Sequence, residues 1–390
     1  MCGLGEIDVR LDSSGAPEAW IFRAGPAEAV LWCQSIHGPA VLRQGSGEER
    51  AWEEPLEALQ WMSASQQEGR WIGFLSYDLG KRFERLPARA VDELGLPAFV
   101  FSRHRGGSSE RGLTLPVRRE TPGHVRSHFS RSEYQAAVAR AIEYVRAGDV
   151  FQVNLSQRFS VECELPAREV YARLTEKTPA KFGALLDYGR FALVSNSPEL
   201  FFRVGTDRKI ITRPIKGTRP IGTGMEEELR ASVKDQAELN MIVDLERNDL
   251  GRVCEIGSVR VSQPRVIEKH PTVYHGVAEV EGQLRGDVGF VDLLRAVFPG
   301  GSVTGAPKIR AMEIIDELEP VSRGPYCGAI GYLDGDGSMQ FNMAIRTMIL
   351  KQGRAHIPVG GGIVADSQPA EEYEETLVKA RAMFAAIGVE

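Results

Sequence analysis

The sequence predicts an α+β fold in which strands and helices form a layered sandwich. Strand-like and helical segments mix without the regular alternation of a doubly wound sheet, and no internal repeat of fixed period is visible. The chain has 390 residues, 43% of them hydrophobic and 26% charged, so it can bury a large core. A Rossmann fold is therefore disfavoured, and a globular α+β protein is expected.

Composition and charge also limit the kinds of partner. The formal net charge of −6 gives no general electrostatic reason to expect binding to nucleic acid or to an anionic membrane. No segment approaches the roughly 18 apolar residues of a membrane span, and no signal-peptide pattern is present. The scattered cysteines fit reduced thiols in the core: Cys2, Cys33, Cys163, Cys254 and Cys327. We expect a cytoplasmic protein with no nucleic-acid or membrane partner.

Two parts of the chain differ in character. All five tryptophans lie in the first 71 residues, whereas the long glycine-rich motifs lie after residue 180. Residues 103–126 are rich in Arg, Gly, Ser and Pro, which is typical of an exposed connection. We therefore divide the chain into a Trp-rich N-terminal subdomain, residues 1–125, and a second domain, residues 126–390, that carries the motifs.

The second domain shows helical and strand-like segments in succession. Ser132 and Gln135 predict a capping box at the start of a helix that ends near Gly148. Strands are expected over residues 150–156, 182–194, 273–280, 329–333 and 343–350. Further helices are expected over residues 226–248, from Pro307 onward, and over residues 371–387. The apolar face of the helix over 226–248 is predicted to contain Leu229, Val233, Ala237, Met241 and Leu245.

Two segments carry candidate catalytic groups beside apolar residues. In TRPIKGTRP, Lys216 is either part of a solvated basic turn or, if buried, an amine with a lowered pKa that is free for nucleophilic attack. In SNSPELFFR, Glu199 is either an edge-strand carboxylate facing water or, if buried, a proton donor with a raised pKa. The residues alone leave both pairs of alternatives open.

Carboxylates on two distant predicted helices form a second candidate site. Glu238 shares a face with Ile242, so its carboxylate should border the core. Glu372, Glu375 and Lys379 share one face of the last helix, which by default is a salt-bridged surface. Two carboxylates from distant helices are also the usual protein contribution to a Mg²⁺ site.

Two further motifs have mainly structural interpretations. The segment PGGSVTGAPK at 299–308 looks like a P-loop, but Ala-Pro precedes Lys308 and no hydroxyl follows it, so it is not a nucleotide-binding motif. His275 lies in a strand-like run, where a lone histidine is more often structural than catalytic. We nevertheless include His275 among the catalytic candidates with Glu199 and Lys216.

Several of these segments, taken in order, resemble the chorismate-utilising enzymes. They are SPELFFR, RPIKGTRP, AELNMIVDLERNDLGRV, YHGVAEVEGQL, FPGGSVTGAPKIRAMEIIDELEP, GAIGYL, IRT and GGGIVADSQPAEEYEE. The match covers roughly residues 127–390, with weaker support from WIGFLSYDLGKRFE at 71–84. The resemblance implies intertwined β-sheets flanked by helices, and it makes chorismate the expected substrate of the second domain.

The resemblance also implies roles for matching positions. Glu238 and Glu375 match Mg²⁺ ligands, with Glu372 nearby and acting through water, and the metal would hold the ring carboxylate. Arg346 and Tyr326 match residues that bind the enolpyruvyl carboxylate, a task that suits the planar fork of arginine. The remaining substrate-binding candidates are Gly361, Gly362, Gln152, Ser302, Thr304 and Lys379.

Two positions distinguish members of this family. Water-using members carry a lysine base where this chain has Gln152, and a glutamine cannot deprotonate water, so ammonia is the expected nucleophile. Anthranilate synthases have alanine where Lys216 stands, whereas PIKGT resembles the aminodeoxychorismate synthases. The expected reaction therefore converts chorismate and ammonia to 4-amino-4-deoxychorismate, a folate precursor, through attack of Lys216 on C2 while Glu199 protonates the departing 4-hydroxyl. The alternatives are an anthranilate synthase component and a non-catalytic chorismate-binding regulator.

The source of ammonia is expected to be external. The sequence has no glutaminase signature such as GxCxG, and Cys327 has different surroundings. We therefore expect a separate glutamine amidotransferase subunit, forming a heterodimer with this chain, or free ammonia. No segment is available for a lyase domain, so pyruvate release should be the work of another protein.

Overall fold

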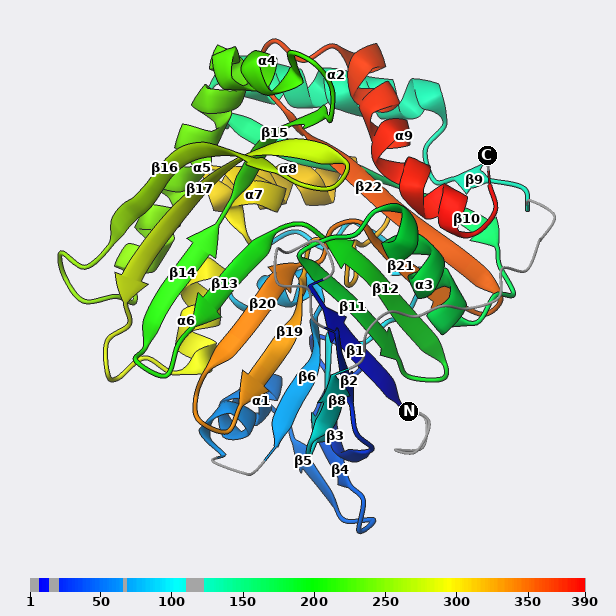
Figure 1. The fold of residues 1–390 in the computed structure, drawn as a ribbon, viewed down its shortest axis with the longest axis vertical. Coiled ribbons are helices and arrows are strands. Elements are labelled where there is room, and N and C mark those ends of the chain that lie inside the picture. The colour runs from blue at the N-terminus through cyan, green and yellow to red at the C-terminus, as the bar shows by residue number, and fades with distance from the viewer. Residues whose placement is uncertain (1–6, 14–20, 66–68, 110–122, 390) are drawn as a thin grey trace.

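The computed structural model describes residues 7–13, 21–65, 69–109 and 123–389. Two large antiparallel sheets with helices around them form the molecule, which confirms the predicted α+β class (Figure 1). Cys2, Trp20 and most of the predicted connection at 103–126 lie outside the described residues. The four described cysteines, Cys33, Cys163, Cys254 and Cys327, are all buried, as expected for small core residues. None of the described helices is long and apolar enough to cross a membrane.

The first sheet has ten strands, with β9 (Arg126–Ser127) pairing with β10 off the main order. In spatial order the others are β18 (Gly305–Ala306), β10 (Gln152–Glu162), β22 (Arg354–Ile363), β21 (Thr347–Lys351), β12 (Phe191–Ser197), β11 (Phe182–Asp187), β1 (Asp8–Asp12), β2 (Ile21–Ala24) and β8 (Gly107–Ser109).

The second sheet has twelve strands, with β16 (Arg260–Lys269) pairing with β17 off the main order. In spatial order the others are β15 (Ile215–Pro220), β17 (Val273–Gln283), β14 (Lys209–Arg213), β13 (Leu200–Val204), β20 (Met339–Met343), β19 (Ala329–Asp334), β6 (Arg70–Leu75), β7 (Phe99–His104), β3 (Ala27–Cys33), β4 (Ala40–Gln44) and β5 (Glu49–Trp52).

Strands from both sides of residue 125 contribute to each sheet. In the first sheet β1 pairs with β11 along its whole length, and in the second sheet β6 pairs with β19 from Arg70 to Leu75. The largest hydrophobic cluster likewise combines Trp52 and Leu59 with Phe290 and Phe341. The two parts of the sequence therefore share their core.

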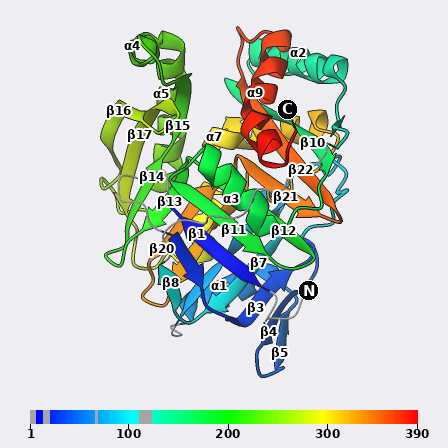
Figure 2. The same cartoon turned by 45° about the vertical axis from the view of Figure 1, so that its right-hand side comes forward.

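Helices surround the sheets, and a 3₁₀ helix spans Tyr77–Arg82. They are α1 (Pro55–Ala64), α2 (Arg131–Ala147), α3 (Ala167–Lys177), α4 (Met225–Ala231), α5 (Val233–Gly251), α6 (Phe290–Val297), α7 (Gly301–Thr304), α8 (Lys308–Leu318) and α9 (Pro369–Ala386). In both views α4 and α5 lie with β15, β16 and β17 on one side, α9 and β22 lie on the other, and α7 lies between them (Figure 2).

The predicted capping box of α2 is displaced by two residues. Ser130, not Ser132, is the N-cap: its Oγ accepts a hydrogen bond from the Glu133 amide at 3.2 Å, and Glu133 Oε2 accepts one from the Ser130 amide at 2.8 Å. A carboxylate in the first helical turn also interacts favourably with the helix dipole, which Gln135 could not do.

The helix predicted over residues 226–248 is two helices. Ser232 ends α4 and caps α5, because its Oγ accepts a hydrogen bond from the Asp235 amide at 3.2 Å. The predicted stripe is wrong at Val233, which is 80% exposed, and at the exposed Ala237, whereas Met241 and Leu245 are half-buried. The buried side chains of α5 are Leu239, Ile242, Val243, Asp249 and Leu250.

Two predicted strands are interrupted. The segment 182–194 forms β11 and the start of β12, with a turn at Gly189, whose φ is +75°. The segment 343–350 is not one strand either, since β20 ends at Met343 and β21 begins at Thr347. Between them Arg346 has a φ of +48°, and the chain passes from the second sheet to the first. The opposite passage, from β12 to β13, occurs at Pro198 and Glu199.

Gly331, in the middle of β19, lies very close to the backbone of β20, so we expect a larger residue there to lower stability. A Cβ added at Gly331 would lie 2.0 Å from the Gln340 carbonyl oxygen and 2.7 Å from the Phe341 Cα. Gly331→Ala should therefore lower the free energy of unfolding by about 1–3 kcal/mol, as overpacked sites do. Gly286→Ala is the matched control, because no atom would lie within 4 Å of its Cβ. Urea denaturation measures both, and equal midpoints for the two variants would contradict the close packing of β19 against β20.

Candidate active site

The chain crosses between the two sheets after β12 and again after β20, and these two crossing segments lie side by side. The Met343 amide donates to the Glu199 carbonyl at 3.1 Å, and Ser197 Oγ donates to the Met343 carbonyl at 2.6 Å. The Asn196 amide donates to the Arg346 carbonyl at 3.0 Å. These backbone contacts hold Glu199 and Arg346 together at the junction of the sheets.

Glu199 is buried, with 5% of its surface exposed, so it does not face water as an edge-strand carboxylate would. Burial raises the pKa of Glu199 to about 7, although the Ser302 hydrogen bond and the charges of Lys216 and Arg346 oppose that rise. Ser302 Oγ donates to Glu199 Oε1 at 2.5 Å. A large share of Glu199 is therefore protonated near neutral pH, as a general acid requires.

Lys216 lies on β15 and its side chain is 13% exposed. The pairing of β15 with β17 is irregular between Ile215 and Thr218, and Gly217 has a φ of +83°. A Cβ at Gly217 would lie 2.6 Å from Leu229 Cδ1, so the bulge requires glycine. Burial lowers the pKa of Lys216, and the Glu238 carboxylate, whose Oε2 lies 3.9 Å from Nζ, opposes this effect. The solvated-turn alternative is thus excluded.

His275 lies on β17 and is almost fully buried. Its Nδ1 and Thr218 Oγ1 are hydrogen-bonded at 2.9 Å, and its ring meets the His270 ring edge-on at 5.0 Å between centroids. Burial, followed by the charge of Arg346, lowers the pKa of His275 well below its usual range. A neutral His275 therefore positions the strand segment after Lys216.

Two carboxylates of α9 lie over Gly361 of β22. A Cβ at Gly361 would lie 3.3 Å from Glu372 Oε2 and 3.4 Å from Glu375 Oε1. Glu372 is buried and accepts a hydrogen bond from Ser367 at 2.7 Å, and burial raises its pKa. Glu375 is half-exposed and pairs with Lys379 at 2.7 Å, which lowers the pKa of Glu375. Lys379 Nζ also donates to the Gly360 carbonyl at 2.7 Å.

Glu238 faces these carboxylates from α5. Its side chain is 17% exposed, one turn before the fully buried Ile242, and burial raises its pKa. The charge of Glu375 acts on the pKa of Glu238 and on that of Lys216, so the three groups interact electrostatically. Carboxylates suit Mg²⁺ chemically. Within the described part of the chain, however, no three His, Cys, Asp or Glu side chains already stand close enough to hold a metal.

Gln152 is fully buried at the start of β10, and neither atom of its amide has a hydrogen-bond partner among the described residues. Its Nε2 lies 2.8 Å from where a Cβ of Gly362 would be. A buried unpaired amide is costly, which indicates a polar ligand or water at this point. Thr304, in contrast, donates to the Gly300 carbonyl at 2.9 Å and is fully buried, so its hydroxyl serves the backbone of α7.

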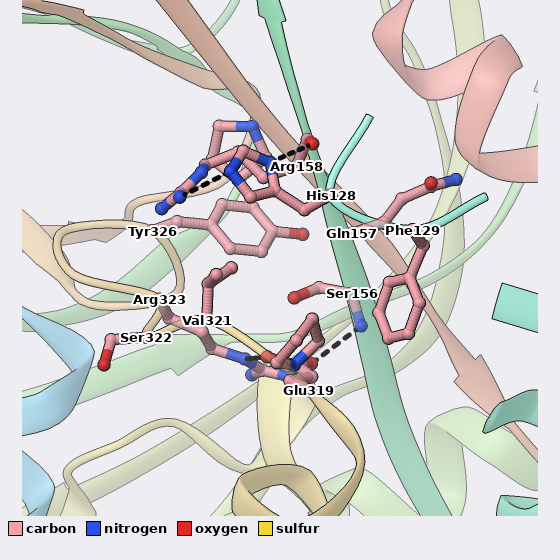
Figure 3. A pocket seen from close by; sticks show the side chains of 12 residues that line it. His128, Phe129, Ser156, Gln157, Arg158, Glu319, Val321, Ser322, Arg323 and Tyr326 are labelled. Carbon is pink, nitrogen blue, oxygen red and sulfur yellow. Dashed lines mark hydrogen bonds and ion pairs between the residues drawn. The ribbon is translucent and has the colours of Figure 1, made fainter. Parts of the chain in front are cut away.

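Arg346 and Tyr326 were predicted to bind the same carboxylate, and the structure shows different surroundings for the two side chains. The Arg346 side chain forms no ion pair or hydrogen bond with any residue that the structure describes, and burial lowers its pKa. Tyr326 lines a neighbouring pocket with Ser156, Arg158 and His128 (Figure 3). An unpaired guanidinium beside Glu199 is suited to a ligand carboxylate, whereas a shared role for Tyr326 stays a prediction.

Sequence reasoning missed another shielded carboxyl, Glu246 of α5. It accepts a hydrogen bond from Thr212, and burial raises the pKa of Glu246 to about 8. One turn further, Asp249 pairs with Lys308 at 2.6 Å and joins α5 to α8. The available signal was spacing, since Glu246 follows the buried Ile242 by four residues.

Comparisons with known proteins agree on one family. A family model described as chorismate binding enzyme matches residues 18–385. Anthranilate synthase component 1 of Pseudomonas aeruginosa is 46% identical over 285 residues, which are 72% of this chain and 58% of that protein. Aminodeoxychorismate synthase component 1 of Klebsiella aerogenes is 42% identical over 338 residues, which are 79% of this chain and 75% of that protein.

A solved structure supports the same fold. Anthranilate synthase component I from Streptococcus pneumoniae superposes with a TM-score of 0.81 and 30% identity, covering 94% of this chain and 92% of that one. The chain shares the fold of that enzyme over most of its length. It spans only 58% of the length of the Pseudomonas relatives.

The buried acid generates a pH prediction. Between its ordinary pKa of 4.5 and its folded value of about 7, Glu199 holds a proton in the folded protein that it has lost in the unfolded chain. Its contribution to the free energy of unfolding therefore falls as the pH rises through this window. The side chain of Glu199→Gln does not titrate, so the variant does not lose stability in this way. The free energy of unfolding of the variant minus that of the unmodified protein should therefore rise by up to about 3 kcal/mol from pH 4.5 to pH 7.

Denaturant unfolding of both proteins at several pH values provides the measurement. A stability difference that stays constant from pH 4.5 to pH 8 would mean that folding does not raise the pKa of Glu199, which would contradict its role as the buried acid.

Proposed function

The chain belongs to the family of chorismate binding enzymes, and we propose that it converts chorismate and ammonia to 4-amino-4-deoxychorismate. The observation that carries this proposal is the position of Lys216, a shielded amine that interacts with Glu199, Glu238 and Glu375. No other described lysine combines a lowered pKa with a neighbouring buried acid of raised pKa. That pair supplies a nucleophile and a proton donor in one site.

Substrate anchoring is proposed to use the groups that the protein itself leaves unpaired. The Arg346 guanidinium would bind the enolpyruvyl carboxylate, and the buried Gln152 amide would meet a polar group of the substrate or the ammonia. Glu238, Glu372 and Glu375 would hold Mg²⁺, which when bound supplies positive charge at the ring carboxylate. The three carboxylates do not stand together in this structure, so holding one ion would require Glu238 of α5 and the two carboxylates of α9 to approach each other.

The proposed reaction has two displacement steps. The Lys216 amine attacks C2 of chorismate, both ring double bonds shift, and the C4–O bond breaks as Glu199 gives its proton to the leaving hydroxyl, which departs as water. The new secondary ammonium on Lys216 then loses one proton, which restores the Glu199 acid. Ammonia next forms a bond to C4, the double bonds shift back, and the C2–N bond to Lys216 breaks. The incoming nitrogen gives one proton to the departing Lys216 nitrogen, so the product carries a neutral 4-amino group and the lysine amine is restored.

One observation favours a second candidate, amination at C2 as in anthranilate synthases. Relatives at 46% and 45% identity carry that name. This activity would require Lys216 to be compatible with direct attack of ammonia at C2, where the anthranilate synthases have alanine. A non-catalytic regulator is disfavoured, since a chain without activity would have no need to retain Glu199, Lys216 and Arg346 in one buried cluster.

Ammonia is proposed to come from a partner. Relatives are named component 1 of their synthases, which supports a second subunit, and the sequence lacks a glutaminase motif. We therefore propose a heterodimer with a glutamine amidotransferase in the cytoplasm, with free ammonia as the substitute in its absence.

The product test is direct. Incubation of the purified chain with chorismate, Mg²⁺ and an ammonium salt should yield 4-amino-4-deoxychorismate, identified by mass spectrometry, and glutamine in place of ammonium should give negligible turnover. Fluorescent anthranilate with stoichiometric pyruvate would contradict the proposal and establish the second candidate.

The nucleophile is tested by two substitutions at one position. Lys216→Ala should lower kcat by about 10²- to 10⁴-fold, as loss of a positioned catalytic group does, and any residual activity should shift toward 2-amination. Lys216→Arg keeps the charge without a nucleophilic amine, so it should be equally impaired. If Lys216 only binds a carboxylate, Lys216→Arg would retain kcat, and Lys216→Ala would mainly raise the KM for chorismate.

A further inference from the structure

Glu268 of β16 lies among three basic side chains. Lys181 Nζ is 2.5 Å from Glu268 Oε2, an Arg213 guanidinium nitrogen is 2.5 Å from Glu268 Oε1, and His270 Nε2 is 3.4 Å from Oε2. The side chains of Lys181, Glu268 and Arg213 are each only about a fifth exposed. The pairs are thus shielded from water, unlike the exposed ion pairs that contribute little to structure.

The partners of Glu268 come from different sheets. Glu268 and Arg213 belong to β16 and β14 of the second sheet, whereas Lys181 directly precedes β11 of the first. Arg213 therefore supports Glu268 from within its own sheet. The ion pair between Lys181 and Glu268 joins the second sheet to the first. It lies toward the end of the second sheet that contains β15, the strand of Lys216.

On one side, this ion pair is connected to the nucleophile through strand register. Glu268 is the cross-strand partner of His275, and His275 is the partner of Thr218 on the other edge of β17. The hydrogen bond between Thr218 and His275 lies two residues from Lys216. A Cβ at Gly276 would lie 2.5 Å from the Lys216 carbonyl oxygen, so β17 and β15 are in close contact here.

On the other side, the pair is connected to the anion-binding side of the site. Asn196 Nδ2 donates to Thr178 Oγ1 at 2.9 Å, and Thr178 opens the short segment that leads to Lys181. The backbone amide of Asn196 donates a hydrogen bond to the backbone carbonyl of Arg346. Lys181 is therefore attached to the same part of the molecule as Arg346 and Glu199. We call this part, built on the first sheet, the first body, and we call β15 to β17 with α4 and α5 the second body.

We propose that Lys181 and Glu268 are positioning residues whose ion pair sets the separation between Lys216 and the Arg346–Glu199 side of the site. The inference rests on the proposed function for its catalytic consequence, but its geometric content does not depend on that function. Without the Lys181 contact, β15 to β17 with α4 and α5 would move relative to the first sheet. Lys216 would then be misplaced for attack on a substrate that Arg346 anchors.

The kinetic test compares three variants. Lys181→Met should lower kcat about 10- to 100-fold, because misplacement of a reacting group by about 1 Å has an effect of this size, and the KM for chorismate should change much less. Lys181→Arg should restore kcat to within about threefold, since it keeps the charge and the reach. Lys209→Met is the matched control and should keep kcat, because Lys209 pairs with Glu281 inside the second sheet, at 2.7 Å.

A distance measurement separates positioning from other roles. Spin labels at Ile256, which is fully exposed beside β16, and at Glu143 of α2 report the separation of the two bodies in a Cys2→Ser background. The distance distribution should broaden in Lys181→Met and in Glu268→Gln but not in Lys209→Met. If Lys181→Met keeps both its kcat and a narrow distribution, or loses kcat with an unchanged distribution, the proposal is overturned. If the unmodified protein does not use chorismate, the proposed function fails, and the distances still decide the role of the pair.

Discussion

Removal of Lys216 and Glu199 from water is the constraint on which the rest of the site depends. Water favours an ammonium and a carboxylate, and burial disfavours both charged forms. In this site burial lowers the pKa of Lys216 and raises that of Glu199 to about 7. Burial therefore increases the share of neutral amine at Lys216, and it keeps a large share of Glu199 protonated near neutral pH. Neither effect would arise on an exposed turn, where each group would keep its ordinary charge.

The fold supplies this dry environment where the chain changes sheets. Glu199 lies at the passage from β12 to β13, and Arg346 lies at the passage from β20 to β21. Backbone hydrogen bonds join the two passages, so the acid and the unpaired guanidinium have a common support. Lys216 and Glu238 come from the other body, formed by β15 and α5. The site is thus divided between two bodies, which explains why contacts such as Lys181–Glu268 matter for its geometry.

The sequence predicted the α+β class of the fold, but it left the surroundings of several site residues open. The apolar neighbours of Glu199 and Lys216 left burial and exposure both open, and the structure shows that both side chains are shielded. The spacing of Glu238 to Ile242 correctly indicated a carboxylate at the border of the core. The break at Ser232 was not predicted, because the hydrophobic periodicity continues across it and only the hydroxyl contact to Asp235 reveals the cap. The positive φ of Arg346 and the position of Tyr326 depend on sheet passages that no local pattern encodes. Lys181 and Glu268 are 87 residues apart and belong to no motif, so only the structure joins them.

The central claim is that Lys216 forms a covalent bond to the substrate, and it is tested most directly without ammonia. The protein would be mixed with chorismate and Mg²⁺ in an ammonia-free buffer, quenched rapidly, digested and analysed by mass spectrometry. The account predicts that the peptide containing Lys216 gains the mass of chorismate less one water, and that Lys216→Arg shows no such peptide. An enzyme that turns over chorismate with ammonium, yet shows no modified Lys216 at any quench time, would contradict the account.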